Sequence, residues 1–277
     1  MSSPIGPEDY MEPRCLLCMD PMGQEQSVKP VPQQRIMEKV DEYMSRRDYA
    51  GVERHLKYWL TEAQLGRDKR GELMVRNELV GHYRKTGQRE EATEQIAAAL
   101  KLIEELDYGD SISAGTTFVN SATALSSFGE NKKALELFEK ALPIYESSAA
   151  ARPELLGGLY NNMALTLCAL KDFSRANELF DRAMEIMDKV PGGELEKAVT
   201  CLNRADLVLA RDGMEKGEGE IFSLLDRAWD TLESFPGNKD GYYAFVCEKC
   251  APGFEYYGYF AAAAELKKRA EEIYDRA

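Results

Sequence analysis

Four of the six cysteines lie in two C-x-x-C pairs, Cys15–Cys18 and Cys247–Cys250. Two such pairs can supply four thiolates to a tetrahedral zinc ion. Cys247 follows Cys18 by 229 positions, which far exceeds the spacing of zinc ribbons or fingers. However, about 30 extended residues reach roughly 100 Å, so the first pair could reach the second. Cys250 is followed by Ala-Pro-Gly, which predicts a helix break like the turn of a zinc knuckle.

An ordinary packing role explains the cysteines more simply. Cys is a small hydrophobe, and Cys247 and Cys250 stand at i and i+3 of an expected helix, where packing residues recur. A redox pair would need a surrounding βαβ pattern, which the sequence lacks. We therefore expect no metal site, with Cys15, Cys18, Cys247 and Cys250 as the zinc candidates if one exists.

Few other residues suit catalysis. Histidine, the side chain most often recruited for acid–base and nucleophilic steps, occurs only at His55 and His82. Both fall within helical patterns, where they are expected to be ordinary helix-face residues. The common glycine-rich phosphate-binding motifs are absent from the sequence. The sequence therefore predicts a protein that is not an enzyme and uses no cofactor.

The charge of the chain argues against several classes of partner. The 48 acidic and 35 basic residues give a formal net charge of -13 at pH 7. Nucleic-acid binding depends on Lys and Arg, so DNA and RNA are not expected partners. No apolar run approaches the length of about 18 residues that spans a membrane, and the first ten residues do not resemble a secretory signal. We expect a cytoplasmic protein without membrane contact.

A 42-residue repeat organises most of the chain. Ala134 and Ala176, 42 residues apart, each begin the pattern Ala-x3-large apolar-x2-Ala, and Ala92 begins a third copy 42 residues before Ala134. In a helix, the small residues let neighbouring helices approach, and the large residue four positions on fills the groove between them. Less regular copies begin at Val52, Ile221 and Ala263.

Turn residues divide the repeats into helix pairs. The Gly-rich stretch Asp212–Gly219 is expected to form a turn that absorbs the extra residues of one repeat. Asp110 or Ser111, and Asp240, are expected N-caps. The pairs are expected near residues 34–66, 72–106, 112–149, 153–190, 194–235 and 240–277, after a Pro-rich tail of residues 1–33.

In three of these pairs, the first helix carries an Asn two residues before a small packing residue, which is Ala122, Ala164 or Ala205. The segments are Val119-Asn-Ser-Ala122, Tyr160-Asn-Asn-Met-Ala-Leu165 and Cys201-Leu-Asn-Arg-Ala-Asp-Leu207. Together with the repeats, these segments resemble the tetratricopeptide repeat (TPR) superfamily over residues 34–277. The 42-residue period is similar to that of the long repeats in kinesin light chains and related bacterial TPR proteins. The resemblance implies an all-α fold, a right-handed α-solenoid of about six TPR-like helix pairs with an irregular N-terminal tail.

The resemblance also implies a concave groove, lined by the first helices, whose Asn side chains hold the backbone of an extended peptide. A carboxamide offers both donors and an acceptor for this task. The alternative is that some of these residues only bond to neighbouring helices. Carried over, the candidate peptide-binding residues are Asn77, Asn120, Asn161, Asn162 and Asn203.

The family's carboxylate clamp for acidic C-terminal peptides is absent, because Asn77 and Gly81 stand at the positions of its Lys and Asn. Arg84 is a further candidate for an acidic ligand, or else part of a solvated helix end. The implied function is a non-catalytic scaffold that binds a protein or peptide. The alternative is a peptide-sensing regulator that acts in trans on a signalling or transcription protein.

Two segments leave alternatives open. Residues 1–33 hold six of the eleven prolines together with apolar residues such as Leu16 and Leu17. This tail is therefore either solvated or packed on the solenoid, including its groove, as an intramolecular ligand. The last repeat is rich in aromatic residues, which form either a bulky cap core or a docking surface. They are Tyr242, Tyr243, Phe245, Phe254, Tyr256, Tyr257, Tyr259 and Phe260.

Overall fold

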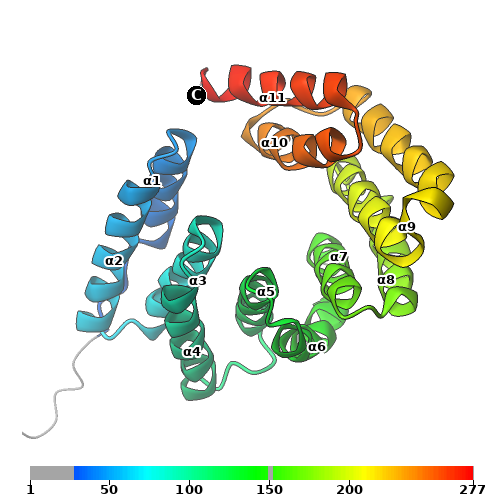
Figure 1. Ribbon diagram of the computed structural model, residues 1–277. Helices are drawn as coiled ribbons and strands as arrows, with labels where there is room; N and C mark the ends of the chain where they lie inside the picture. The colour runs from blue at the N-terminus through cyan, green and yellow to red at the C-terminus, as the bar shows by residue number, and fades with distance from the viewer. Residues whose placement is uncertain (1–27, 149–151, 277) are drawn as a thin grey trace, which may run out of the picture.

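The computed structural model describes residues 28–148 and 152–276, and every regular element within them is an α-helix (Figure 1). The expected all-α fold is therefore confirmed. The helices are α1 (Gln33–Ser45), α2 (Tyr49–Leu65), α3 (Lys69–Thr86), α4 (Arg89–Glu105), α5 (Ile112–Ser127), α6 (Asn131–Ser148), α7 (Pro153–Ala169), α8 (Phe173–Met187), α9 (Glu194–Glu233), α10 (Gly241–Tyr256) and α11 (Phe260–Tyr274).

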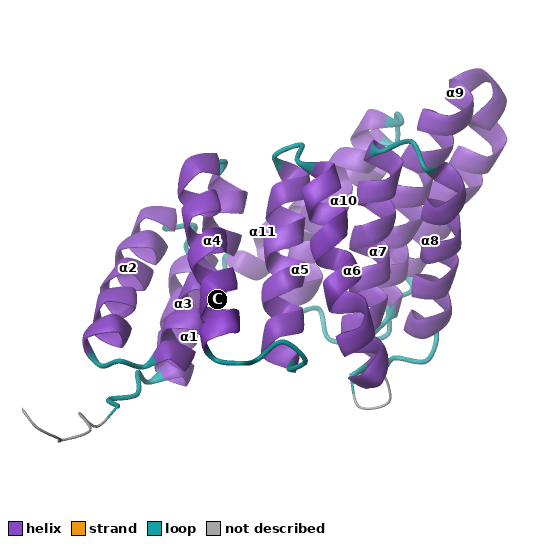
Figure 2. Ribbon diagram, turned by 90° about the horizontal axis from the view of Figure 1, so that it is seen from below, coloured by secondary structure: helices purple, strands orange, loops and turns teal. Residues whose placement is uncertain are grey.

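Consecutive helices pack as pairs, and the pairs stack side by side (Figure 2). α9 supplies both helices of the fifth pair, because Gly213 (φ 75°, ψ 172°) turns the chain within it. Across this turn, a Cβ added at Gly217 would lie 2.8 Å from Val208 Cγ1. The turn expected over Asp212–Gly219 is thus a single residue. The extra residues of this repeat instead lengthen its two helices, whose junction projects beyond the neighbouring pairs.

Left-handed residues close several of the turns between helices. Arg47, Arg67 and Lys171 have φ angles of 55°, 54° and 64°. Each is followed by an Asp that caps the next helix; Asp48, for example, accepts a hydrogen bond from the Gly51 N–H at 2.7 Å. The left-handed residue reverses the chain and the carboxylate satisfies a free N–H group of the next helix. A short Arg-Asp or Lys-Asp sequence therefore ends one helix and starts another.

The expected N-caps Ser111 and Asp240 are confirmed, since both accept hydrogen bonds from the first turn of α5 and α10. The expected helix break after Cys250 is wrong, because α10 runs through Pro252. Proline removes one helical hydrogen bond, but Phe254 lies fully buried on the same helix. The core contacts of this ring stabilise the helical turn that contains the proline.

The repeat pattern supplies the core. Ala134, Phe138 and Ala141 of α6 are fully buried, as are Ala176 and Phe180 of α8. The alanines let adjacent helices approach, and each phenyl ring fills the space between them. Burying one such ring contributes about 2–3 kcal/mol, so the pattern that reveals the repeats is also the main source of their stability.

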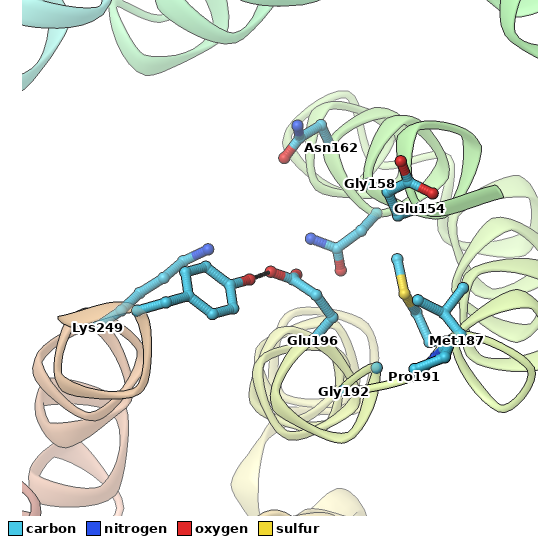
Figure 3. A pocket seen from close by; sticks show the side chains of 12 residues that line it. Glu154, Gly158, Asn162, Met187, Pro191, Gly192, Glu196 and Lys249 are labelled. Carbon is cyan, nitrogen blue, oxygen red and sulfur yellow. Dashed lines mark hydrogen bonds between the residues drawn. The ribbon is translucent and has the colours of Figure 1, made fainter. Parts of the chain in front are cut away.

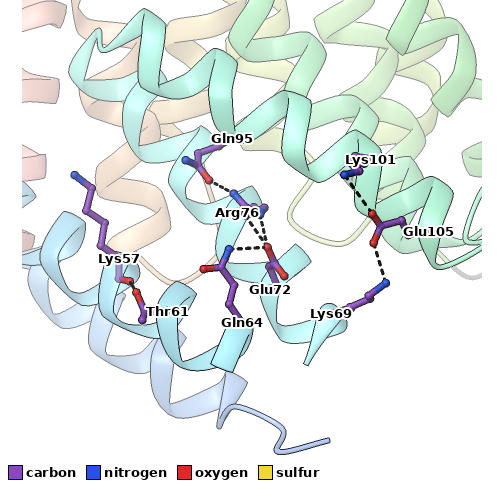
Figure 4. Close-up of polar contacts among 9 residues, drawn as sticks. All are labelled: Lys57, Thr61, Gln64, Lys69, Glu72, Arg76, Gln95, Lys101 and Glu105. Carbon is purple, nitrogen blue, oxygen red and sulfur yellow. Dashed lines mark hydrogen bonds and ion pairs between the residues drawn. The ribbon is translucent and has the colours of Figure 1, made fainter. Parts of the chain in front are cut away.

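A polar network joins the second and third helices to the fourth (Figure 4). Arg76 of α3 donates to Glu72 on its own helix and to Gln95 of α4, both at 2.6 Å. Gln64 of α2 also donates to Glu72, at 3.1 Å. Arg76 and Glu72 are mostly buried, so these bonds fix how α2, α3 and α4 pack together.

The pairs follow an arc that curves almost into a ring (Figure 1). α3, α5, α7 and α10 line its inner, concave side, while α4, α6, α8 and α11 lie outside. The first pair consequently comes next to the last, where Arg47 Nη2 is 3.3 Å from Glu248 Oε1. Within residues 28–148 and 152–276, no helix combines the length and apolar character needed to cross a bilayer.

Candidate functional site

Two hollows open on the concave side of the arc. The first, of about 640 Å³, lies between α7, α9 and α10 (Figure 3). Gly158 leaves much of this space open, because a Cβ at that position would have no neighbour within 4 Å. Asn162 and Lys249 point into the hollow from opposite sides. Its wall is therefore polar and has room for a ligand.

The second hollow, of about 560 Å³, lies between α3 and α5. Asn77 and Glu78 of α3 face Thr116 and Asn120 of α5 across it. The two hollows are separate depressions of the same inner surface, one near each end of the row of first helices. We call this row the concave groove.

One register position recurs along the groove. It stands two residues before the small packing residue of each first helix from α3 to α10. Four of its five occupants, all but Asn203, line one of the two hollows. The occupants are Glu78, Asn120, Asn162, Asn203 and Lys249, and we call them the inner tier.

Asn77 and Asn161 lie one residue before the inner tier and join neighbouring repeats. Asn77 Nδ2 donates to Thr117 Oγ1 at 2.9 Å. Asn161 is buried, and its Oδ1 accepts hydrogen bonds from Thr200 at 3.2 Å and from Asn203 at 3.1 Å. Both carboxamides thus bond to the next first helix, which was the stated alternative to peptide contact.

The other candidate asparagines are placed differently. Asn120 and Asn162 are half-buried, and their side chains make no hydrogen bond within residues 28–148 and 152–276. Asn203 is also half-buried, with one donor committed to Asn161. The structure therefore brings three carboxamides to the groove with donors and acceptors available.

Two cations extend the groove beyond the asparagines. Arg84 follows Asn77 by two helical turns on α3 and is exposed. Partial burial of its guanidinium nevertheless lowers the pKa of this group. Lys249 of α10 lies at the opposite end of the groove. In the part of the chain that the structure describes, neither side chain has a carboxylate within 4 Å.

Sequence reasoning missed Lys249 and Glu196, and it named Tyr242 only as one of the aromatic residues of the last repeat. The Tyr242 hydroxyl donates to the Glu196 carboxylate at the edge of the first hollow, and burial followed by this carboxylate raises the pKa of Tyr242. A signal for Lys249 was present, because it stands two residues before Ala251 in the same register as the asparagines. Its position inside a C-x-x-C pair drew attention to the cysteines instead.

The zinc candidates of the last repeat lie in the core. Cys247 and Cys250 are fully buried in α10, and burial raises the pKa of Cys250 to about 12. Such a thiol resists forming the thiolate that binds zinc. Among the described residues, no group of three or more metal-ligating side chains comes together. Cys15 and Cys18 lie outside the described residues.

Two family models described as tetratricopeptide repeat match this sequence, over residues 72–147 and 157–190. These ranges cover the pairs from α3 to α8, where the 42-residue repeat is most regular. The chain belongs to the tetratricopeptide repeat superfamily. No curated protein matches this TPR chain at a significant level.

Solved structures share the fold of this TPR protein at low sequence identity. The apo form of RapI is 17% identical, with 87% of this chain and 82% of that chain covered and a TM-score of 0.56. A variant of a putative kinesin light chain from Podosopora anserina, with nearly identical TPR-like repeats, is 18% identical over 73% of this chain and 93% of that chain, with a TM-score of 0.50. These likenesses confirm the α-solenoid fold.

Proposed function

We propose that this protein is a non-catalytic scaffold that binds an extended segment of a protein or peptide in its concave groove. The observation that carries the proposal is the inner tier, where three successive first helices present Asn120, Asn162 and Asn203 at one register position. A carboxamide can donate to a peptide carbonyl and accept from a peptide N–H. A row of them therefore suits a ligand recognised through its main chain.

The spacing of the helices matches an extended chain. Packed helix axes lie about 8–10 Å apart, and an extended chain advances about 3.3–3.6 Å per residue. Each asparagine would therefore meet about every third residue of the ligand. Apolar side chains complete the surface, because Leu165 follows Asn162 by three residues and Phe245 precedes Lys249 by four, and both are exposed.

A displayed library of random twelve-residue peptides tests the proposal. Peptides selected on the wild-type protein should lose at least about tenfold in affinity for Asn162→Ala, which corresponds to about 1.4 kcal/mol. Gly158→Leu should also abolish binding, because the new side chain enters the first hollow. Gly219→Leu is the matched control, since Gly219 is also a helical glycine with open space around a Cβ but lies outside the groove. The proposal fails if no peptide is selected, or if Gly219→Leu reduces binding as much as Gly158→Leu.

A further inference from the structure

The inner tier has a charge at each end. Its first member is a carboxylate, Glu78 of α3, its last is an ammonium, Lys249 of α10, and the three members between them are neutral amides. We propose that the ligand of the groove is dipolar, with a cation that meets Glu78 and an anion that meets Lys249. This inference rests on the proposed function and specifies the class of peptide that the groove accepts.

The Glu78 end has a carboxylate that lines the second hollow and forms no ion pair in the described residues. Arg70 also lines the second hollow, but its guanidinium lies over the Tyr108 ring, 5.5 Å from the centroid. Burial, followed by the charge of Asp41 on α1, raises the pKa of the Glu78 carboxyl. Both causes disfavour the ionised form of the carboxyl, and the attraction of a ligand cation placed here would offset them. This end of the groove is therefore complementary to a Lys, an Arg or a free amino terminus.

The Lys249 end has a cation that forms no ion pair in the described residues. Its side chain extends from α10 toward the first hollow (Figure 3). Two carboxylates line the first hollow with it, and one of them, Glu154, is paired with Arg152 at 2.7 Å. The nearby Glu196 carboxylate accepts the Tyr242 hydroxyl and forms no ion pair with Lys249. An ammonium group carries three donors, so it can bind a carboxylate of the ligand. The matching group is an Asp, a Glu or a free carboxyl terminus.

The tier also sets the length of the ligand. Four steps between adjacent first helices, at about 8–10 Å each, separate Glu78 from Lys249 along the groove. An extended chain needs about 10–12 residues to span this path. The two ligand charges should therefore lie about 10–12 residues apart, whichever way the chain runs.

Four peptides built on one selected twelve-residue sequence test this inference. All are acetylated and amidated, and they differ only in their end residues: Lys and Glu, Lys and Lys, Glu and Glu, or Gln and Gln. By isothermal titration calorimetry, the Lys/Glu peptide should bind the wild-type protein about fivefold to tenfold more tightly than the others, since a partly screened ion pair contributes about 1 kcal/mol. A fifth peptide, the Gln/Gln sequence with free termini, separates the two sources of charge, because it binds as tightly as the Lys/Glu peptide only if free termini can replace the side chains.

Single charge reversals predict a change of preference. Glu78→Lys should favour the Glu/Glu peptide, and Lys249→Glu should favour the Lys/Lys peptide. Glu78→Gln and Lys249→Gln keep the side-chain shape and should each reduce the preference, which covers the case that a reversal unfolds the protein. Equal affinities of the four peptides for the wild-type protein, or unchanged preferences in the variants, would overturn the dipolar ligand. If the dipolar ligand is overturned but the proposed function is right, Asn162→Ala will still lower the affinity of the protein for every peptide.

Discussion

Arg47 and Glu248, 201 residues apart in the sequence, form an ion pair of 3.3 Å between the first and last helix pairs. The guanidinium of Arg47 also lies over the ring of Tyr274 in α11, 5.7 Å from its centroid. Both charged side chains remain about half exposed, at 56% and 47%. An ion pair of this kind contributes only about 0–1 kcal/mol and weakens in salt, so the arc is held nearly closed by a weak contact.

We therefore expect Arg47→Gly to open the arc. Its radius of gyration, measured by small-angle X-ray scattering, should exceed that of the wild type at low salt, and the difference should shrink at high salt. Arg67→Gly is the matched control, because Arg67 has the same left-handed backbone (φ 54°) in another turn. Both changes should also stabilise their turns by about 1 kcal/mol, since glycine adopts this backbone without strain. An equal expansion in Arg67→Gly would show that the turn, and not the ion pair, controls the shape.

Adjacent asparagines on α7 should differ in what they do. Asn161→Ala leaves the Asn203 amide without its buried acceptor and should lower the free energy of unfolding by about 1–3 kcal/mol. Asn162→Ala removes a side chain that points into the groove and should change it by less than about 0.5 kcal/mol. Urea denaturation of both variants checks this. A larger loss of stability in Asn162→Ala would reverse the assignment of the two residues.

The carboxyl of Glu78 should make stability depend on pH. Its pKa in the folded protein is raised above the ordinary value of 4.5. The favourable contribution of the protonated carboxyl to the free energy of unfolding is therefore complete below pH 4.5, and it is lost as the pH rises through the folded pKa. Glu78→Gln should therefore raise the melting temperature at pH 7 and leave it unchanged near pH 3.

Glu53 is the control for this measurement of melting temperature, because its pKa shifts in the opposite direction. The Lys57 ammonium, 2.6 Å away, lowers the pKa of the Glu53 carboxyl. The stability that this pair contributes is present above the ordinary value of 4.5 and is lost as the pH falls through the folded pKa. Glu53→Gln should therefore lower the melting temperature at pH 7. If both variants shift in the same direction, the burial of Glu78 is not the cause.

Zinc content tests the role of the cysteines. Cys247 and Cys250 are buried thiols with raised pKa values in the core of α10. We expect the purified, reduced protein to hold far less than one zinc per chain by elemental analysis. Cys250→Ala should lower its stability by about 1 kcal/mol through lost packing. One zinc per chain that disappears in both Cys15→Ser and Cys250→Ser would contradict this expectation.

Local patterns were sufficient to predict the helix pairs. The spacing of Ala134, Phe138 and Ala141 repeats because each helix must bury the same face, so sequence and packing carry the same period. The caps Ser111 and Asp240 are equally local, since a cap bonds to an N–H two or three residues away. Pro252 was misjudged, because buried neighbours override the local preference of Pro for breaking a helix. The Gly213 turn lies within the expected stretch but needs only one non-helical residue.

The sequence by itself therefore determined the fold class, the repeat register and the asparagines that recur in it. Only the tertiary structure decided which of two adjacent residues, Asn161 or Asn162, faces the groove, because about 100° of helical rotation separates them. It also decided that Arg47 meets Glu248. That contact depends on small rotations between repeats that accumulate along the whole arc, and no short stretch of sequence contains their sum.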